Sequence, residues 1–337
     1  MKVLFDHPNP FLLAHGGFQT QIEQTKSGLE ANGVEVEYLR WWDERQNGDI
    51  IHYFGRPTIW YLEFARQKGM KIILAQLLTG PGSRPPWVLW TQKQCIAIAR
   101  RVLPKMITSQ FAWDSFQRAD ACVALTAWEA HLMSYLFGAL PEKVHVLPNG
   151  VEEVFQSSQA VPRGPWLVCS ATITQRKRVL ELAEAAVFAQ TPVWIIGKAY
   201  AESDPYAQRF HTLASRHPKI IRFEGCIQDR AKLAQVYREA RGFVLLSTME
   251  SLSLSALEAA ACECPLLLTD LPWARSTFGE HAMYCPITSP ERTAEYLRTF
   301  YDQAPSLKPP PKPLTWLAVA LKLKQIYQRL LNVPVQF

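Results

Sequence analysis

Short apolar runs alternate with stretches of helical spacing along most of the chain. Runs typical of buried strands lie at residues 2–5, 35–39, 50–54, 71–74, 121–125 and 143–147, and then at 166–170, 193–196, 220–223, 242–247 and 265–270. Because helical patterns separate these strands in both halves, the sequence predicts two doubly wound α/β domains. We place the domains at 1–158 and 159–312, followed by a last amphipathic helix within 313–337.

Two glutamates, Glu250 and Glu258, lie between the last two predicted strands. Residues 254–261 are rich in Leu, Ala and Glu, which favour helix, so Glu250 is expected on the preceding loop and Glu258 on the helix. The start of a helix offers free N–H groups and a positive dipole end to a phosphate. Two carboxylates beside such a seat suit a nucleotide sugar. The alternative is a chance pair, since Glu is common in the first turn of helices.

Three consecutive cations, Arg176, Lys177 and Arg178, follow the strand at 166–170 and precede a predicted helix. Cations at a helix start oppose its dipole, and a conflict of this kind is typical of functional sites. A bound diphosphate would resolve it, because Arg binds phosphate bidentately and Lys as a point charge. A solvated basic turn is the alternative.

The run 247–265, with Glu250 and Glu258 separated by seven residues and followed by Ala-Ala-Ala-Cys, resembles the signature of family 4 glycosyltransferases. The segment 171–178 resembles that family's Gly-Arg-Leu-x-x-x-Lys-Gly motif, with Lys177 on its Lys and with Ala-Thr replacing Gly-Arg. The resemblance implies a GT-B fold, in which two Rossmann-like domains face a cleft. It also implies that the C-terminal helix crosses back to the first domain.

The resemblance further implies roles in the second domain. Glu250 would contact the donor sugar, Glu258 would bind the nucleotide ribose, and Arg176 and Lys177 would stabilise the departing diphosphate. The remaining contacts are expected from backbone groups: those of Leu252, Ser253 and Leu254 toward the diphosphate, and that of Cys226 toward the nucleobase. Backbone recognition leaves no side-chain pattern, so the base cannot be read from the sequence.

Candidates in the first domain come from the same resemblance. Gly16 and Gly17 match a glycine loop that lies over the diphosphate and acceptor, although a simple turn is the alternative. His52 matches a histidine near the acceptor, although a lone His at a strand end is more often structural. Many relatives carry a His after the fourth strand. This chain has none there, and Gln76 is the candidate replacement.

Composition narrows the classes of partner and location. The 337 residues are 48% apolar and 20% charged, and the net charge of +6 is compatible with anionic substrates or an anionic membrane. No nucleic-acid-binding motif occurs, so we expect no nucleic-acid partner. The start of the chain lacks a signal peptide and no apolar run reaches 18 residues, which predicts a cytoplasmic protein.

Neither a metal nor a cofactor is expected beyond the donor substrate. The seven cysteines lack zinc-site spacing, and the sequence contains no Asp-x-Asp. Trp87 and Trp90, followed by Arg100, Arg101 and Lys105, form an aromatic and basic segment. It predicts either peripheral contact with the inner face of a membrane that carries a lipid-linked acceptor, or a solvated helix with buried Trp.

These observations predict a retaining, metal-independent glycosyltransferase that moves a sugar from a nucleotide-diphosphate sugar to an acceptor hydroxyl. A saccharide or lipid-linked acceptor, and hence polysaccharide or glycoconjugate synthesis, is expected. Two alternatives stay open: a GT-B epimerase that interconverts nucleotide sugars, and a degenerate transferase that binds a partner without catalysis.

Overall fold

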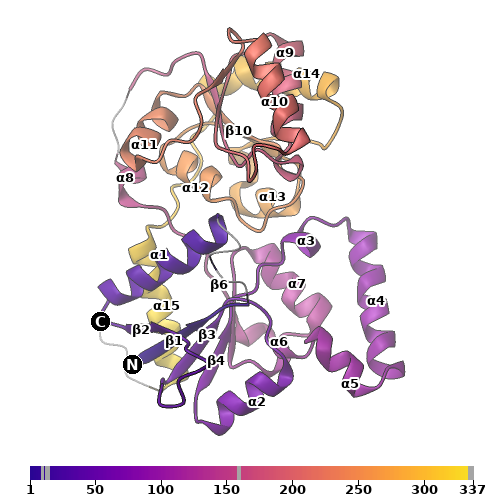
Figure 1. The fold of residues 1–337 in the computed structure, drawn as a ribbon, viewed down its shortest axis with the longest axis vertical. Helices are drawn as coiled ribbons and strands as arrows, with labels where there is room; N and C mark the ends of the chain where they lie inside the picture. Colours follow the sequence, from indigo (N-terminus) through magenta and orange to yellow (C-terminus); the bar gives the residue numbers. More distant parts are fainter. Residues whose placement is uncertain (9–10, 12–15, 158–160, 333–337) are drawn as a thin grey trace. The chain divides into compact units, whose positions relative to one another are not determined.

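The computed structural model describes residues 1–8, 11, 16–157 and 161–332. The chain divides into two compact units: residues 1–150 together with the segment from Leu314 onward, and residues 151–313. Each unit contains a six-stranded parallel sheet flanked by helices (Figure 1). Among the described residues, no helix has both the length and the apolar character needed to span a bilayer.

The sheet of the first unit contains all six strands predicted for that half. Their spatial order is β2 (Glu35–Tyr38), β1 (Lys2–Asp6), β3 (Ile50–Tyr53), β4 (Lys71–Leu74), β5 (Ala121–Ala124) and β6 (Val144–Val146). The order reverses at β1, whose Val3 pairs with both Val36 and Ile50.

Helices cover this sheet and account for most of the intervening chain. They are α1 (Gly17–Ala31), α2 (Ile59–Gln67), α3 (Thr79–Gly82), α4 (Pro86–Val102), α5 (Lys105–Thr108), α6 (Ser115–Arg118), α7 (Ala127–Phe137) and α15 (Trp316–Leu330), with short 3-10 turns at Ser109–Phe111 and Pro141–Lys143. The C-terminal helix α15 packs against α1, where Gly28 comes close to Ala320. The expected return of this helix to the first unit is thereby confirmed.

Both faces of the first sheet are buried, as strand alternation requires. Val3 and Phe5 point into a core shared with α1 and α15. Leu4 points into the opposite core, which contains Leu89 from α4 and Leu132 from α7. The inner strands β1, β3, β4 and β5 are therefore largely apolar, which is why their sequence pattern was readable.

Gly150 closes the first unit for a different reason from the one that its Asn-Gly sequence suggests. Such a pair favours a left-handed turn, but neither Asn149 nor Gly150 has a positive φ, so no such turn forms here. A Cβ on Gly150 would lie 2.5 Å from the backbone N of Trp316. Glycine is needed here because the start of α15 passes against the backbone.

The sheet of the second unit has the order β12 (Met283–Cys285), β11 (Leu266–Thr269), β10 (Gly242–Leu245), β7 (Leu167–Ser170), β8 (Val193–Ile196) and β9 (Ile221–Phe223). Five of these strands were predicted. The sixth, β12, was missed because it is a three-residue edge strand in which only Cys285 is fully buried.

The helices of the second unit are α8 (Glu153–Gln156), α9 (Val179–Ala189), α10 (Pro205–Arg216), α11 (Arg230–Glu239), α12 (Leu254–Ala261), α13 (Pro272–Phe278) and α14 (Pro290–Gln303), with short 3-10 turns at Gln175–Lys177, Gly279–His281 and Ala304–Ser306. The core lies where α9 and α14 pack on the sheet, through residues such as Leu182 and Leu297. Phe155 of α8 is fully buried.

Candidate functional site

The second sheet places two loops of the predicted site side by side. Strands β7 and β10 are parallel neighbours, and the order of strands reverses between them. In open α/β sheets, ligands bind at the carboxyl ends of the strands at such a switch point. The loop after β7 carries Arg176 and Lys177, and the loop after β10 carries Glu250.

Backbone hydrogen bonds join these two loops. The carbonyl of Arg176 accepts from the N–H of Thr248 at 2.8 Å and from its hydroxyl at 3.2 Å. The Ser247 hydroxyl lies 3.2 Å from the same carbonyl. Thr174 starts the turn that carries the cations, because its hydroxyl accepts from the N–H of Lys177 at 3.4 Å. The loops therefore form one connected unit.

Glu250 binds both cations through one carboxylate oxygen. Its Oε1 lies 3.0 Å from Nη1 of Arg176 and pairs with Nζ of Lys177. Nη1 of Arg176 also donates to the carbonyl of Met249 at 2.8 Å. The side chains of Glu250 and Lys177 are only 11% and 13% exposed, so solvent screens their charges little. Two cations and one carboxylate leave one positive charge, which can attract an anion.

Arg178, the third cation, has a separate task. It is 7% exposed, has a φ of 52°, and donates to the carbonyl of Thr288. This contact connects the start of α9 with the segment before α14. Since Lys177 and Arg178 are both largely buried, the turn is not a solvated basic loop. Its conflict with the dipole of α9 is offset by Glu250 and by the Thr288 carbonyl.

Glu258 lies on α12 and is bound to a residue that the sequence reasoning missed. Its Oε1 pairs with Arg230, whose Nε also donates to Glu152 at 2.8 Å. The hydroxyl of Tyr237 is 3.5 Å from the other oxygen of Glu258. Burial raises the pKa of Glu258, and the charge of Arg230 opposes that rise. If Glu258 binds the nucleotide ribose as expected, it does so with a carboxylate that is also paired with Arg230.

Arg230 had one signal in the sequence. It is the first residue of α11, directly after the capping Asp229, so it opposes the helix dipole as Arg176 and Lys177 do. Its partners could not be read, because Glu258 and Glu152 are 28 and 78 residues away along the chain. The guanidinium of Arg230 also lies over the ring of Phe155, with its Cζ 4.7 Å from the ring centroid.

The other predicted positions of the second unit lie on loops, or at the start of a helix, at the same edge of the sheet. Leu252 and Ser253 are buried, and Leu254 is the first residue of α12, which the Ser253 hydroxyl caps through the N–H of Ala256. Cys226 is exposed on the loop after β9. The neighbouring Gly225 carbonyl accepts from Gly197 at 3.0 Å, which links this loop to the one after β8. Their contacts with a ligand stay predictions.

Gly16 and Gly17 lie where the resemblance expects them, at the start of α1. Gly16 has a φ of 128°, a conformation that suits glycine, and its carbonyl accepts from the N–H of Thr20 at 3.1 Å. The adjoining loop residues 9–10 and 12–15 are outside the described chain. Gln76 follows β4 and donates its side-chain amide to the Leu77 carbonyl at 2.9 Å. Ligand contacts of these three residues stay predictions.

His52 lies in the core of the first unit and is 1% exposed. Its Nδ1 is 2.6 Å from the hydroxyl of Tyr327 on α15, and its ring stacks on Phe54. Burial lowers the pKa of His52 to about 3, so the imidazole is neutral at ordinary pH. The contact joins β3 to the C-terminal helix, which is a structural task. A role toward an acceptor stays a prediction.

A family match covers the loops of the second unit that carry the charged candidates. Residues 164–303 match the family model described as glycosyl transferases group 1. The second unit therefore carries a segment similar to that family, and the matched residues include Arg176, Lys177, Glu250 and Glu258. Within the described residues, no cluster of three or more His, Cys, Asp or Glu has the geometry of a metal site.

Two curated proteins are similar over part of the chain. A D-inositol 3-phosphate glycosyltransferase of Jonesia denitrificans is 28% identical over 46% of this chain and 42% of its own length. An alpha-galactosylglucosyldiacylglycerol synthase of Streptococcus pneumoniae is 26% identical over 39% of this chain and 35% of its own length. The chain thus matches less than half of either relative.

Similarity in structure extends over nearly the whole chain. The Anabaena protein HepE, solved in complex with UDP and glucose, has a TM-score of 0.63 at 14% identity, with coverage of 99% of this chain and 100% of that one. At this identity the likeness shows the fold alone. The chain has the GT-B fold that the sequence predicted.

Proposed function

We propose that the chain is a retaining glycosyltransferase that moves a sugar from a nucleotide-diphosphate sugar to an acceptor hydroxyl. The observation that carries this proposal is the meeting of Arg176, Lys177 and Glu250 at the switch point of the second sheet. The match of residues 164–303 to a glycosyltransferase family supports it. The paired cations give the diphosphate a seat, and the carboxylate between them gives the sugar a hydrogen-bond acceptor.

The proposed transfer takes place on one face of the donor sugar. The acceptor oxygen bonds to the anomeric carbon while the bond from that carbon to the phosphate oxygen breaks. The proton of the acceptor hydroxyl moves to the departing phosphate oxygen. Arg176 and Lys177 stabilise the charge that develops there, and the start of α12 adds its dipole. Glu250 orients the donor sugar and acts neither as nucleophile nor as base.

Substrate classes follow from the relatives only as proposals. HepE was solved with UDP and glucose, which supports a UDP-sugar as the first donor to test. The name of the pneumococcal relative describes a glycolipid synthase, which supports a lipid-linked or saccharide acceptor. We place the reaction in polysaccharide or glycoconjugate synthesis. No metal is required in this scheme, because Arg176, Lys177 and the positive end of the α12 dipole together offset the charge of the diphosphate.

The test is a panel of nucleotide sugars, assayed for binding and for slow release of nucleoside diphosphate. Wild type is compared with Glu250→Gln and Lys177→Met. Arg209→Met is the matched control, since Arg209 of α10 pairs with Glu184 at 3.7 Å and is not on either loop of the site. We expect hydrolysis of one donor, lost in the two site variants and retained in the control.

Other outcomes separate the alternatives. Interconversion of one nucleotide sugar into its epimer without an acceptor would identify an epimerase. Tight donor binding without hydrolysis or transfer would identify a degenerate, non-catalytic protein. If no donor of the panel bound, the transferase proposal would be wrong.

A further inference from the structure

Helices α4 and α5 expose an unusual amount of apolar surface. Six large side chains between 47% and 77% exposed follow one another along these helices and the turn after them, namely Trp87, Trp90, Ile98, Val102, Met106 and Phe111. We call this surface the α4–α5 ridge. The sequence left open a solvated helix whose tryptophans are buried. That alternative is excluded, because Trp87 is 69% exposed and Trp90 is 57% exposed.

On α4, the ridge is the face that points away from the rest of the unit. Leu89 and Ile96 are buried and pack the other face into a core shared with α7. Trp87 and Ile98 are eleven residues apart, which is three helical turns, so they share one face, opposite to Leu89 and Ile96. Figure 1 shows α4 at the margin of the first unit, with α7 between it and the sheet.

Charge on this segment has one sign. Between Glu63 and Asp114 the sequence contains no acidic residue and eight Lys or Arg. Both flanking carboxylates are engaged, since Glu63 pairs with Arg118 and Asp114 pairs with Arg100, each at 2.7 Å.

Two cations beside the ridge are available to a partner. Arg101 and Lys105 are exposed, and neither forms an ion pair within the part of the chain that the structure describes. They lie where α4 ends and α5 begins, next to Val102 and Met106. The ridge thus combines exposed apolar side chains with neighbouring cations. A partner with an apolar interior and an anionic surface would complement both.

We infer that the α4–α5 ridge docks on an anionic lipid surface. Tryptophans favour the interface between headgroups and acyl chains, and an amphipathic helix lies in that plane with its apolar face inserted. Lys and Arg beside the helix gain from the surface potential of anionic lipids. The inference concerns the first unit and stands independently of the proposed sugar transfer, because vesicle binding needs no donor.

The experiment is co-sedimentation of the full chain with phosphatidylcholine vesicles, with and without phosphatidylglycerol. We expect binding to the anionic vesicles and on the order of tenfold weaker binding to the neutral ones. Trp87→Gln with Trp90→Gln, and Arg101→Glu with Lys105→Glu, should each weaken anionic binding about tenfold or more. All four side chains are exposed, so thermal unfolding should match wild type.

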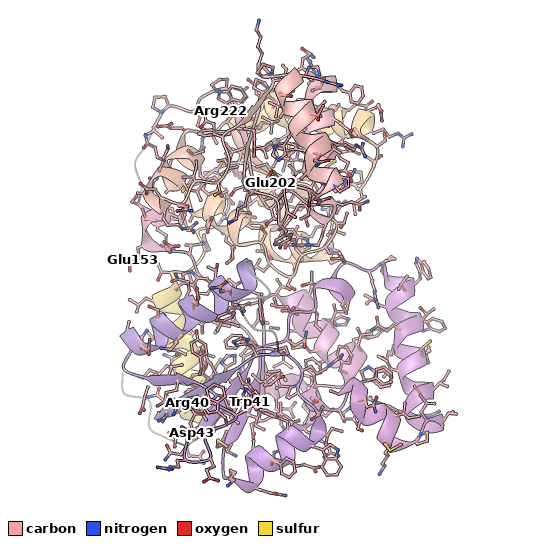
Figure 2. All side chains as sticks on the ribbon, viewed as in Figure 1. Arg40, Trp41, Asp43, Glu153, Glu202 and Arg222 are labelled. Carbon is pink, nitrogen blue, oxygen red and sulfur yellow. The ribbon has the colours of Figure 1, made fainter. Side chains whose placement is uncertain are left out.

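Trp41→Gln with Trp42→Gln is the matched control. These tryptophans are 84% and 72% exposed in the loop after the edge strand β2, where Figure 2 labels Trp41 beside Arg40 and Asp43. The control should bind like wild type. Absence of wild-type binding, or equal binding by the Trp87 and Trp90 variant, would overturn the inference. So would a lipid-free dimer that the same variants dissociate in sedimentation velocity, because the partner would then be a second copy.

Discussion

The two sheets hold the candidate residues at their carboxyl ends in different ways. In the second unit, Arg176, Lys177 and Glu250 come from two loops and bind one another. In the first unit, His52 is a neutral core residue and Gln76 bonds to its neighbour's carbonyl. A nearly buried charge must have a partner, so charged candidates specify each other. Neutral candidates such as His52 and Gln76 do not require a charged partner. Their contacts therefore say less about whether they bind a ligand.

The largest expected effect is on the charged cluster of the second unit. Lys177→Met should lower kcat/KM by about a hundredfold to a thousandfold, the range for loss of one group that stabilises a developing oxyanion. The same change should weaken binding of the free nucleoside diphosphate. Steady-state kinetics with the donor identified by the panel, together with calorimetry, measure both quantities.

Glu250→Gln should separate binding from turnover. Removing the carboxylate frees Arg176 and Lys177 from their internal partner, so nucleoside diphosphate should bind at least as tightly as to wild type. Turnover should still fall, because the sugar loses its orienting contact. If the variant lost diphosphate binding instead, Glu250 would be needed to position the cations, and its assignment to the sugar would be wrong.

The charged cluster was predictable because each of its loops follows a readable apolar strand. Periodicity located β7 and β10. Arg176 and Lys177 were marked as candidates because cations at the start of a helix oppose its dipole. Pairing Arg230 with Glu258 was not predictable, since it depends on how α11 packs against α12. Likewise, no local pattern reveals that Tyr327, 275 residues further on, reaches His52.

The fold was predictable to the same extent and for the same reason. Eleven apolar runs became strands because parallel sheets bury both faces. The edge strand β12 was missed because a short, half-exposed run gives little signal, and α10 was missed because only three of its twelve residues are buried. The reason for Gly150 could not be read from the sequence, because a close approach by Trp316 and a left-handed turn both favour glycine, and only the structure distinguishes them.

The second largest effect tests the structural task of His52. Its pKa is lowered from 6.5 to about 3, so the unfolded chain binds a proton between these values that the folded chain does not. The contribution to stability is therefore complete above pH 6.5 and is lost as the pH falls toward 3. Between pH 7 and pH 5 this loss should reach about 2 kcal/mol.

Urea unfolding of wild type and His52→Gln at both pH values measures this contribution. The variant should show a flatter dependence on pH, although it is less stable at pH 7. Tyr327→Phe keeps the imidazole but removes its partner, and should cost about 1 to 3 kcal/mol at neutral pH. If the free energy of unfolding of wild type depended on pH as little as that of the variant, the imidazole would be accessible to solvent. Such access is what a role at an acceptor site would require.

A smaller effect is expected at Arg230, which holds Glu258. Arg230→Gln removes the charge that opposes the burial of Glu258, so the pKa of that carboxyl should rise further. Donor KM should increase by about tenfold at neutral pH, the order expected for losing a charged hydrogen-bond partner. The acidic limb of kcat/KM should move to higher pH, while kcat at saturating donor changes little.

Arg230→Lys is the matched variant, because it keeps the charge and loses the two-armed contact with Glu258 and Glu152. It should restore the position of the acidic limb and only part of the KM. A purely structural role for Arg230 would lower the melting temperature of both variants and leave the acidic limb where wild type has it.

The smallest expected effect is that of a chelator. In the proposed mechanism the charge on the diphosphate is offset by Arg176, Lys177 and the dipole of α12, so EDTA should leave the turnover of wild type unchanged. Adding Mg²⁺ should likewise fail to rescue Lys177→Met, because the described residues offer no cluster of three or more His, Cys, Asp or Glu that could hold the ion there. Loss of wild-type turnover in EDTA, restored by Mg²⁺, would show that the two cations do not suffice. The charged cluster of the second unit would then need a metal ion in addition to its own side chains. Mutually paired charges would no longer distinguish it from the candidate residues of the first unit.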